Sequence, residues 1–208
     1  NNQARLVHVS GGGTHTINIE NATFTNNSVK GCGAIFLMDQ SNAGNASAIN
    51  VYGGTFTDNA CLLSSASYGS GSIARLKSPG ALHFYGGTFA NNTTAAGKNY
   101  EGIYLRDVSQ KLGSNVYVHK LSADLNVYLT PSSAKVFMSR IVVDSALTHT
   151  ISVYIADNRV PAKGMPLVVG TDEYKLSEAD LAMVKSANPK ATFYLDTENN
   201  AICIAKAE

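Results

Sequence analysis

Short segments in which apolar and polar residues alternate run through the first half of the chain. The clearest begins at Ile17, and matching segments begin at Ile49 and Leu82. Alternation with a period of two residues directs one set of side chains into a core and the other into solvent, which predicts β-strands. A second group of strand-like segments lies between these, and its members are residues 33–39, 72–78 and 102–107.

The alternating segments belong to an internal repeat. Its three copies are INIENATFTNN, INVYGGTFTDN and LHFYGGTFANN, and they begin at Ile17, Ile49 and Leu82. Gly, Asn, Ser and Thr dominate this half of the chain and disfavour helix interiors. Several strands per repeat without a helix predict an all-β fold, a parallel, right-handed β-helix whose coils stack about 4.8 Å apart. A β-propeller is the alternative, but its blades are usually about 40 residues or longer.

Stacking of coils would place equivalent side chains above one another as ladders. The repeat predicts an internal aromatic ladder and an asparagine ladder at a turn, where asparagine tolerates left-handed backbone. The aromatic ladder is Phe24, Phe56 and Phe89, and the asparagine ladder is Asn27, Asn59 and Asn92. The glycine pair of the second and third copies is interpreted as a corner, because no helix follows it to form a phosphate site.

The repeat fades after about residue 110, although strand patterns continue as shorter segments. We assign residues 1–160 to the β-helix, with coils of about 32–33 residues that are clearest at 14–110. Residues 161–208 are predicted to form a small C-terminal α+β cap. Its helix is expected at 176–187, with Ser177 as N-cap and Asp180 in the capping-box position, and its hairpin turns at Asn199–Asn200.

Three short motifs carry a resemblance to a known group of proteins. FTNN, FTDN and FANN resemble the FxxN element of polymorphic outer-membrane autotransporters, and GCGAIF (Gly31–Phe36) resembles their GGAI element. The GGTF…N style is also similar to large β-helix cell-surface proteins of Gram-positive gut bacteria. The resemblance covers roughly residues 10–110 and implies an adhesin-type protein displayed on a bacterial cell surface. Further coils or another domain are expected before Asn1, as flanking parts of a longer chain.

The composition narrows the classes of partner. The 208 residues carry 16 Lys and Arg against 15 Asp and Glu, with no long basic run, so we expect no nucleic-acid partner. No apolar run approaches the ~18 residues of a membrane span. Three cysteines do not suit a disulfide framework, and the five histidines do not pair at a metal-ligand spacing. We therefore expect no metal and no cofactor, and His15 and His83 are expected to face outward.

A catalytic surface is one interpretation of the charged residues. Polysaccharide lyases and glycoside hydrolases on β-helices need clustered carboxylates or acids beside a basic residue. Asp39, Ser78 and Asp107 are predicted to occupy like positions in the second strand group, as are Met38, Lys77 and Arg106. The catalytic candidates are Asp39, Arg106 and Asp107, with Arg75 and Lys77 on the same surface. A solvated ladder of charges at the strand ends is the alternative.

A binding surface is the other interpretation, and it rests on tyrosines. Tyr52 and Tyr85 are equivalent in consecutive copies, Glu20 takes this place in the first copy, and Tyr104 lies in the other strand group. Exposed tyrosines can stack on sugar rings while the hydroxyl stays in water. The alternative is that they only fit a half-buried sheet.

The function predicted from the sequence is a non-catalytic extracellular β-helix module of a larger bacterial surface protein. It would serve as a stalk or as an adhesion module that contacts a glycan or a host or neighbouring cell-surface protein. A carbohydrate-active enzyme and a purely structural spacer remain the alternatives.

Overall fold

The computed structural model describes residues 6–30, 35–40, 46–62, 72–77, 79–94, 102–107, 113–130, 138–161 and 164–207. Strands dominate these residues, and one short α-helix, α1 (Glu178–Met183), is found among them. The predicted all-β class with parallel sheets is confirmed. Within the described part of the chain, no helix is long and apolar enough to cross a membrane.

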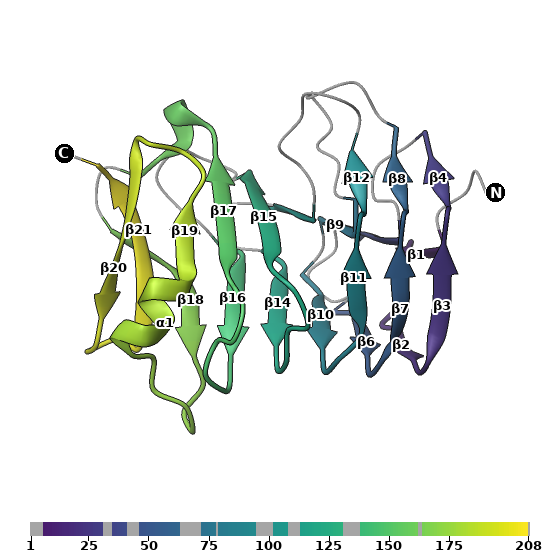
Figure 1. Cartoon of the computed structure of the whole chain (residues 1–208), viewed down its shortest axis with the longest axis horizontal. Helices are drawn as coiled ribbons and strands as arrows, with labels where there is room; N and C mark the ends of the chain where they lie inside the picture. The colour runs from purple at the N-terminus through teal and green to yellow at the C-terminus, as the bar shows by residue number, and fades with distance from the viewer. Residues whose placement is uncertain are drawn as a thin grey trace.

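Two large sheets run along the length of the molecule, with the two chain ends at opposite ends of its long axis (Figure 1). The seven-stranded sheet has the order β1 (Val7–Ser10), β5 (Phe36–Asp39), β9 (Ala74–Leu76), β13 (Ile103–Arg106), β15 (Leu125–Thr130), β17 (Ile151–Ile155) and β19 (Val184–Ser186). The eight-stranded sheet has the order β2 (Thr16–Ile19), β6 (Ala48–Val51), β10 (Ala81–Phe84), β14 (Asn115–Val118), β16 (Arg140–Val143), β18 (Met165–Gly170), β21 (Ala201–Lys206) and β20 (Ala191–Asp196). Strands that neighbour each other in space come from successive stretches of the chain, and the pairing is parallel except at β21.

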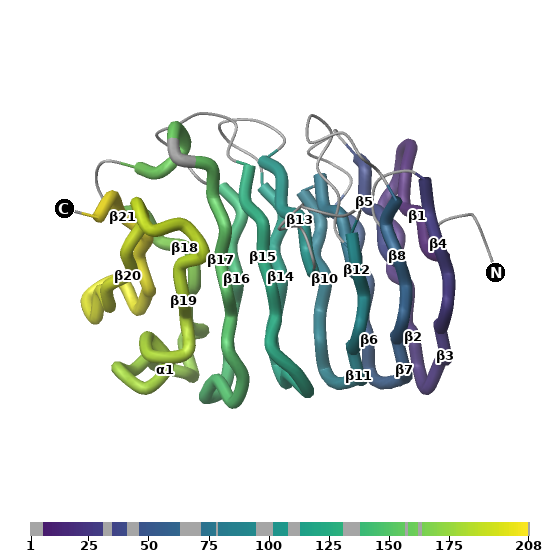
Figure 2. Tube along the Cα trace, turned by 45° about the horizontal axis from the view of Figure 1, so that its top comes forward, coloured from purple at the N-terminus to yellow at the C-terminus, as the bar shows by residue number. Residues whose placement is uncertain are grey.

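Two small sheets of three strands accompany only the first three copies of the repeat. One consists of β3 (Ala22–Thr25), β7 (Gly54–Thr57) and β11 (Thr88–Ala90), and the other of β4 (Ser28–Val29), β8 (Ala60–Cys61) and β12 (Thr93–Thr94). After β14 the chain passes through residues 119–124 directly into β15 (Figure 2). The number of residues between equivalent positions therefore falls. Asn27 and Asn59, which bond each other, are 32 residues apart, whereas the bonded pair Ser114 and Ser139 is 25 apart.

The core lies between the large sheets and is built from alternate residues of each strand. In the eight-stranded sheet, Ile49, Leu82, Val116 and Ile141 are successive register partners and are fully buried. Burial of each such side chain stabilises the fold by about 1.5–3 kcal/mol. The period-two pattern read from the sequence therefore does mark the side chains that face the core.

The glycine pair of the repeat is a corner between β6 and β7. Gly54 has a φ of 116°, and a Cβ there would lie 2.3 Å from the Ala22 carbonyl oxygen of the preceding copy. Only glycine fits this combination of backbone angle and close approach. In the first copy Asn21 turns the corner instead, with a φ of 50°.

Both predicted ladders have close geometry in the structure. The ring of Phe56 stacks on Phe24 at 5.2 Å and on Phe89 at 4.6 Å between centroids. Along the other ladder, Asn27 Nδ2 donates to Asn59 Oδ1 at 2.9 Å, and Asn59 Nδ2 donates to the oxygen of the next asparagine, Asn92, at 2.9 Å. The side chains thus tie each copy of the repeat to the next, in addition to the backbone pairing.

The C-terminal segment departs in part from the prediction. The capping box of Ser177 and Asp180 is present, but α1 ends at Met183 and residues 184–186 form β19 instead of a third helical turn. Val184 pairs with Ile151 of β17, so a β-branched residue at the sheet edge favours strand pairing over helix. The predicted hairpin consists of β20 and β21, and β21 pairs antiparallel with β18.

Candidate functional site

Five aromatic side chains lie together outside the core, on β10 and β14 and at the residues that directly follow β6, β10 and β14. We define the aromatic surface as Tyr52, His83, Tyr85, Tyr117 and His119. Each is sequence-adjacent to a core residue of the eight-stranded sheet, since Val51, Phe84 and Val118 point inward. Alternation along the strands therefore places these rings outward.

The rings of the aromatic surface form two neighbouring stacks. In the first, Tyr52 and Tyr85 are 4.8 Å apart between centroids, and Tyr85 and His119 are 4.0 Å apart with an interplanar angle of 2°. In the second, His83 stacks on Tyr117 at 4.2 Å. Tyr52 and Tyr85 remain 47% and 37% exposed.

Stacking changes how these tyrosines can bind a ligand. Both faces of Tyr85 are covered by Tyr52 and His119, so its ring offers solvent an edge and a hydroxyl group. Tyr52 begins the stack. The expectation that sugar rings stack on the tyrosine faces therefore does not hold for Tyr85. Hydrogen bonds to hydroxyls and contacts with ring edges are the available interactions.

A chain of hydrogen bonds joins the two stacks to an acidic residue. His83 Nδ1 and His119 Nε2 are 3.2 Å apart, and His119 Nδ1 bonds the Asp144 carboxylate. The pairing was missed in the sequence because the copy that contains His119 lacks the rest of the motif. If Val118 is aligned with Phe84 in the sequence, His119 takes the position that Tyr52 and Tyr85 hold in the preceding copies.

The pKa of His83 is lowered from its ordinary value, because the imidazole is partly buried and because His119 lies beside it. The folded chain therefore favours neutral His83, whereas the unfolded chain takes up a proton near pH 6.5. Below about pH 6.5 the unfolded state binds more protons at His83 than the folded state does. The contribution of neutral His83 to the free energy of unfolding is therefore fully present above that pH and is lost as the pH falls toward the folded pKa. The titratable groups around His83 are His119, Tyr85, Tyr117 and, through His119, Asp144.

We expect His83→Asn to flatten the dependence of the melting temperature on pH. The new amide would extend a row of asparagines on neighbouring strands. Asn50 is the register partner of residue 83, Asn18 is the partner of Asn50, and these two side chains already bond each other at 2.9 Å. Melting followed by circular dichroism between about pH 7.5 and 5.5 measures the effect. A slope in His83→Asn as steep as that of the wild type would contradict the assignment to His83.

The catalytic candidates are not brought together. Asp39 lies in register with Lys77, its partner in an ion pair at 3.2 Å, and Lys77 in turn aligns with Arg106. The prediction that Met38 aligns with Lys77 is wrong, since Met38 pairs with Leu76. Asp107 lies one residue beyond and is 5% exposed, so its predicted place on an exposed carboxylate surface is also wrong.

Asp107 has a structural environment. Its carboxylate accepts hydrogen bonds from the backbone N–H groups of Met138 and Ser139 at 3.0 and 2.9 Å, and from the Ser139 hydroxyl at 2.7 Å. A buried carboxylate whose oxygens are occupied in this way ties β13 to the start of β16.

Asp107→Ala is expected to lower the free energy of unfolding by about 1–3 kcal/mol, because it leaves buried donors without an acceptor. Asp39→Ala is the matched control, since Asp39 belongs to a half-exposed ion pair whose loss costs about 0–1 kcal/mol. Urea unfolding of the two variants measures the difference. Equal effects would show that Asp107 does not hold these strands together.

The third predicted contact residue, Tyr104, is 3% exposed and is not a surface tyrosine, contrary to the prediction. Its ring stacks on Tyr128 at 5.2 Å, and Tyr128 stacks on Tyr154 at 5.0 Å. Arg75, expected on the charged surface, is also buried, with its guanidinium carbon 6.0 Å from the centre of the Tyr104 ring.

No three His, Cys, Asp or Glu side chains in the described ranges are grouped so that they could hold a metal ion. No family model matches the sequence, and no curated protein or solved structure is significantly similar to it.

Proposed function

We propose that this chain is a non-catalytic module of a longer bacterial surface protein, located outside the cell, and that its sheets are the walls of a right-handed parallel β-helix. The observation that carries the proposal is the register between successive copies, which continues through both large sheets and both side-chain ladders. Such stacking makes a stiff rod, because each coil is bonded along its length to the next.

The C-terminal segment supports an ordered end to this rod. A coil end exposes unpaired strand edges, which favour unwanted association. Here the antiparallel strands β21 and β20 follow β18, and α1 lies beside β19 and β20 (Figure 1). Helix and hairpin together therefore serve as a cap.

The aromatic surface supports a contact function for the rod. It combines exposed tyrosine hydroxyls with two histidines on an otherwise weakly charged chain. Surfaces of this composition suit glycans and polar protein partners, which are recognised through hydrogen bonds and aromatic contact. We propose that the rod contacts a glycan or a neighbouring cell-surface protein here.

The carboxylates argue against an enzyme. Glycoside hydrolysis needs two carboxyl groups facing one substrate bond. Asp107 is buried and accepts three hydrogen bonds, and Asp39 is paired with Lys77, so these two carboxyl groups do not face one substrate bond.

A glycan array combined with lyase and hydrolase assays on the same polysaccharides tests the proposal. We expect binding without turnover, weakened in Tyr85→Ala and unchanged in Tyr194→Ala, which alters an exposed tyrosine of the cap. Turnover of any polysaccharide would overturn the non-catalytic assignment. Failure to bind any glycan would exclude glycan contact and leave contact with a neighbouring cell-surface protein or a purely structural role.

A further inference from the structure

An open hollow lies at the corner between the aromatic surface and β11. Its lining is Tyr52, Gly54, Tyr85, Gly86, Gly87, Thr88, Lys120 and Ser122. Its cavity volume is about 370 Å³. Sites for small molecules usually enclose about 300–1,000 Å³, so a sugar residue is a suitable occupant by size.

The glycine corner of the repeat contributes backbone without side chains to the lining of this hollow. A Cβ at Gly86 would lie 2.9 Å from the Tyr52 carbonyl oxygen, and Gly87 has a φ of 103°, which side chains rarely allow. The floor of the hollow is therefore bare backbone. A ligand can reach this floor without displacing side chains.

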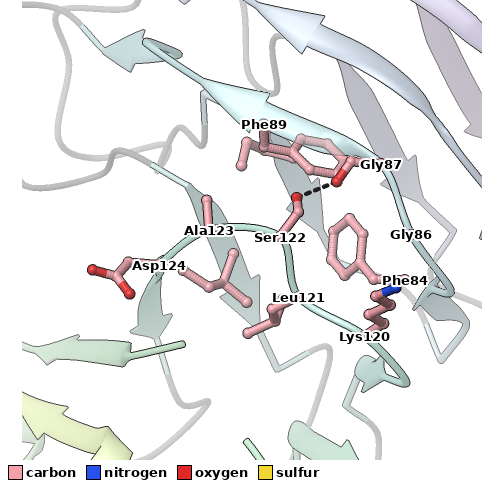
Figure 3. Close-up of a pocket in the computed structure, with 11 residues that line it drawn as sticks. Phe84, Gly86, Gly87, Phe89, Lys120, Leu121, Ser122, Ala123 and Asp124 are labelled. Carbon is pink, nitrogen blue, oxygen red and sulfur yellow. Dashed lines mark hydrogen bonds between the residues drawn. The ribbon is translucent and has the colours of Figure 1, made fainter. Parts of the chain in front are cut away.

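The shortening of the coils after β14 supplies the opposite wall. Residues 119–124 replace two strands and pass beside the Gly86–Gly87 corner, where Ser122 donates a hydrogen bond to the Gly87 carbonyl (Figure 3). On the inner side of this loop, Leu121 lies near Phe84 and Phe89. The loop is thus anchored on both sides, which holds Lys120 at the rim.

Charge selects the class of ligand. Lys120 is exposed, and it is the one charged residue among the described residues that line the hollow. Two carboxylates near this loop have partners of their own: Asp144 bonds His119, and Asp124, in the same loop as Lys120, accepts the Thr150 N–H at 2.8 Å. Tyr52 and Tyr85 contribute hydroxyl groups and ring edges beside this single positive charge.

From this arrangement we infer that the hollow binds a carboxylate-bearing sugar, with Lys120 on the carboxylate and the tyrosines on the sugar hydroxyls. The inference rests on the proposed glycan contact and names its ligand class and position. A lysine–carboxylate hydrogen bond gives the charged sugar an advantage that a neutral sugar lacks.

Calorimetric titration with oligosaccharides of polygalacturonate, polymannuronate and hyaluronate, each as free acid and as methyl ester, tests this inference. At least one free acid is expected to bind about tenfold more tightly than its ester, and Lys120→Ala is expected to bring acid and ester to equal affinity. Lys120→Arg should retain it. Lys175→Ala is the matched control, since Lys175 is an exposed lysine near the cap helix.

The outcomes separate the two proposals. Equal affinity for acid and ester, or unchanged acid binding in Lys120→Ala, would overturn the acidic-sugar inference and leave glycan contact standing. Absence of binding to all of these oligosaccharides, together with binding of neutral glycans on the array, would overturn the inference alone. Absence of binding to any glycan would overturn both.

Discussion

Phe56→Ala is expected to lower the free energy of unfolding by about 3–5 kcal/mol. The ring of Phe56 is fully buried, stacks between Phe24 and Phe89, and meets the edge of Phe36 at 5.8 Å. Removal of the ring leaves a cavity. The cavity cannot close, because β7 is paired on one side with β3 and on the other with β11, which keeps the neighbouring copies apart.

Phe24→Ala is the matched control. Phe24 occupies the same place in the first copy, is half-buried and stacks on one ring, so we expect about half the loss. The chain has no tryptophan, so urea unfolding is best followed by far-ultraviolet circular dichroism. If the two variants lost equal stability, the middle position of the stack would not have the structural importance assigned to it.

Asp180→Ala is expected to lower the free energy of unfolding by about 3 kcal/mol or more, since hydrogen bonds to a buried carboxylate contribute about 1.5–3 kcal/mol each. Asp180 accepts from Leu147 N–H at 3.0 Å, from Tyr174 Oη at 2.8 Å, and from the backbone and hydroxyl of Ser177 at 2.9 and 2.7 Å. These contacts join the start of α1 to the segment before β17. The variant should therefore loosen the C-terminal segment from the preceding strands.

Glu178→Ala is the control, because Glu178 is an exposed acid in the same helical turn. Hydrogen exchange measured by mass spectrometry would locate the effect. Faster exchange is expected in α1, β19 and the segment around Leu147 in Asp180→Ala alone. Uniform behaviour of the two variants would show that α1 is held by its apolar contacts and not by this carboxylate.

The pKa of Asp180 adds a pH dependence to this prediction. Burial raises this pKa, but the hydrogen bonds from Leu147, Ser177 and Tyr174 outweigh burial and hold it below its ordinary value. The stabilisation is therefore complete above the ordinary aspartate pKa near 3.9 and is lost as the pH falls toward the folded pKa. Asp180→Asn should flatten the acid limb of the stability curve.

Spacing in the sequence was sufficient to predict the strands and ladders of the first three copies. Loops of nearly constant length separate these copies, so Ile17, Ile49 and Leu82 fall into register and carry the ladder residues with them. The capping box was predictable for a similar reason, since it depends on two residues three positions apart.

The register between β5 and β9 was not predictable, whereas the predicted match of Lys77 with Arg106 is correct. The connection that precedes β5 is shorter than the one that precedes β9, so Asp39 aligns with Lys77 and Arg106 and not with Asp107. An error of one residue moves a side chain to the other face of a strand. The sequence spacing therefore predicts a surface position for Asp107, although the residue is buried.

The sequence by itself determined the all-β class, the parallel stacking of the early copies and the corner role of the paired glycines, because these depend on local alternation and on a repeat of nearly constant length. Only the tertiary structure shows which side chains are in contact where the connections between strands differ in length. It brought His83 to His119, placed Lys120 beside Tyr85 at the glycine corner, and occupied Asp107 with backbone donors. Contacts of this kind depend on how each loop closes, and loop closure is set by packing rather than by local pattern.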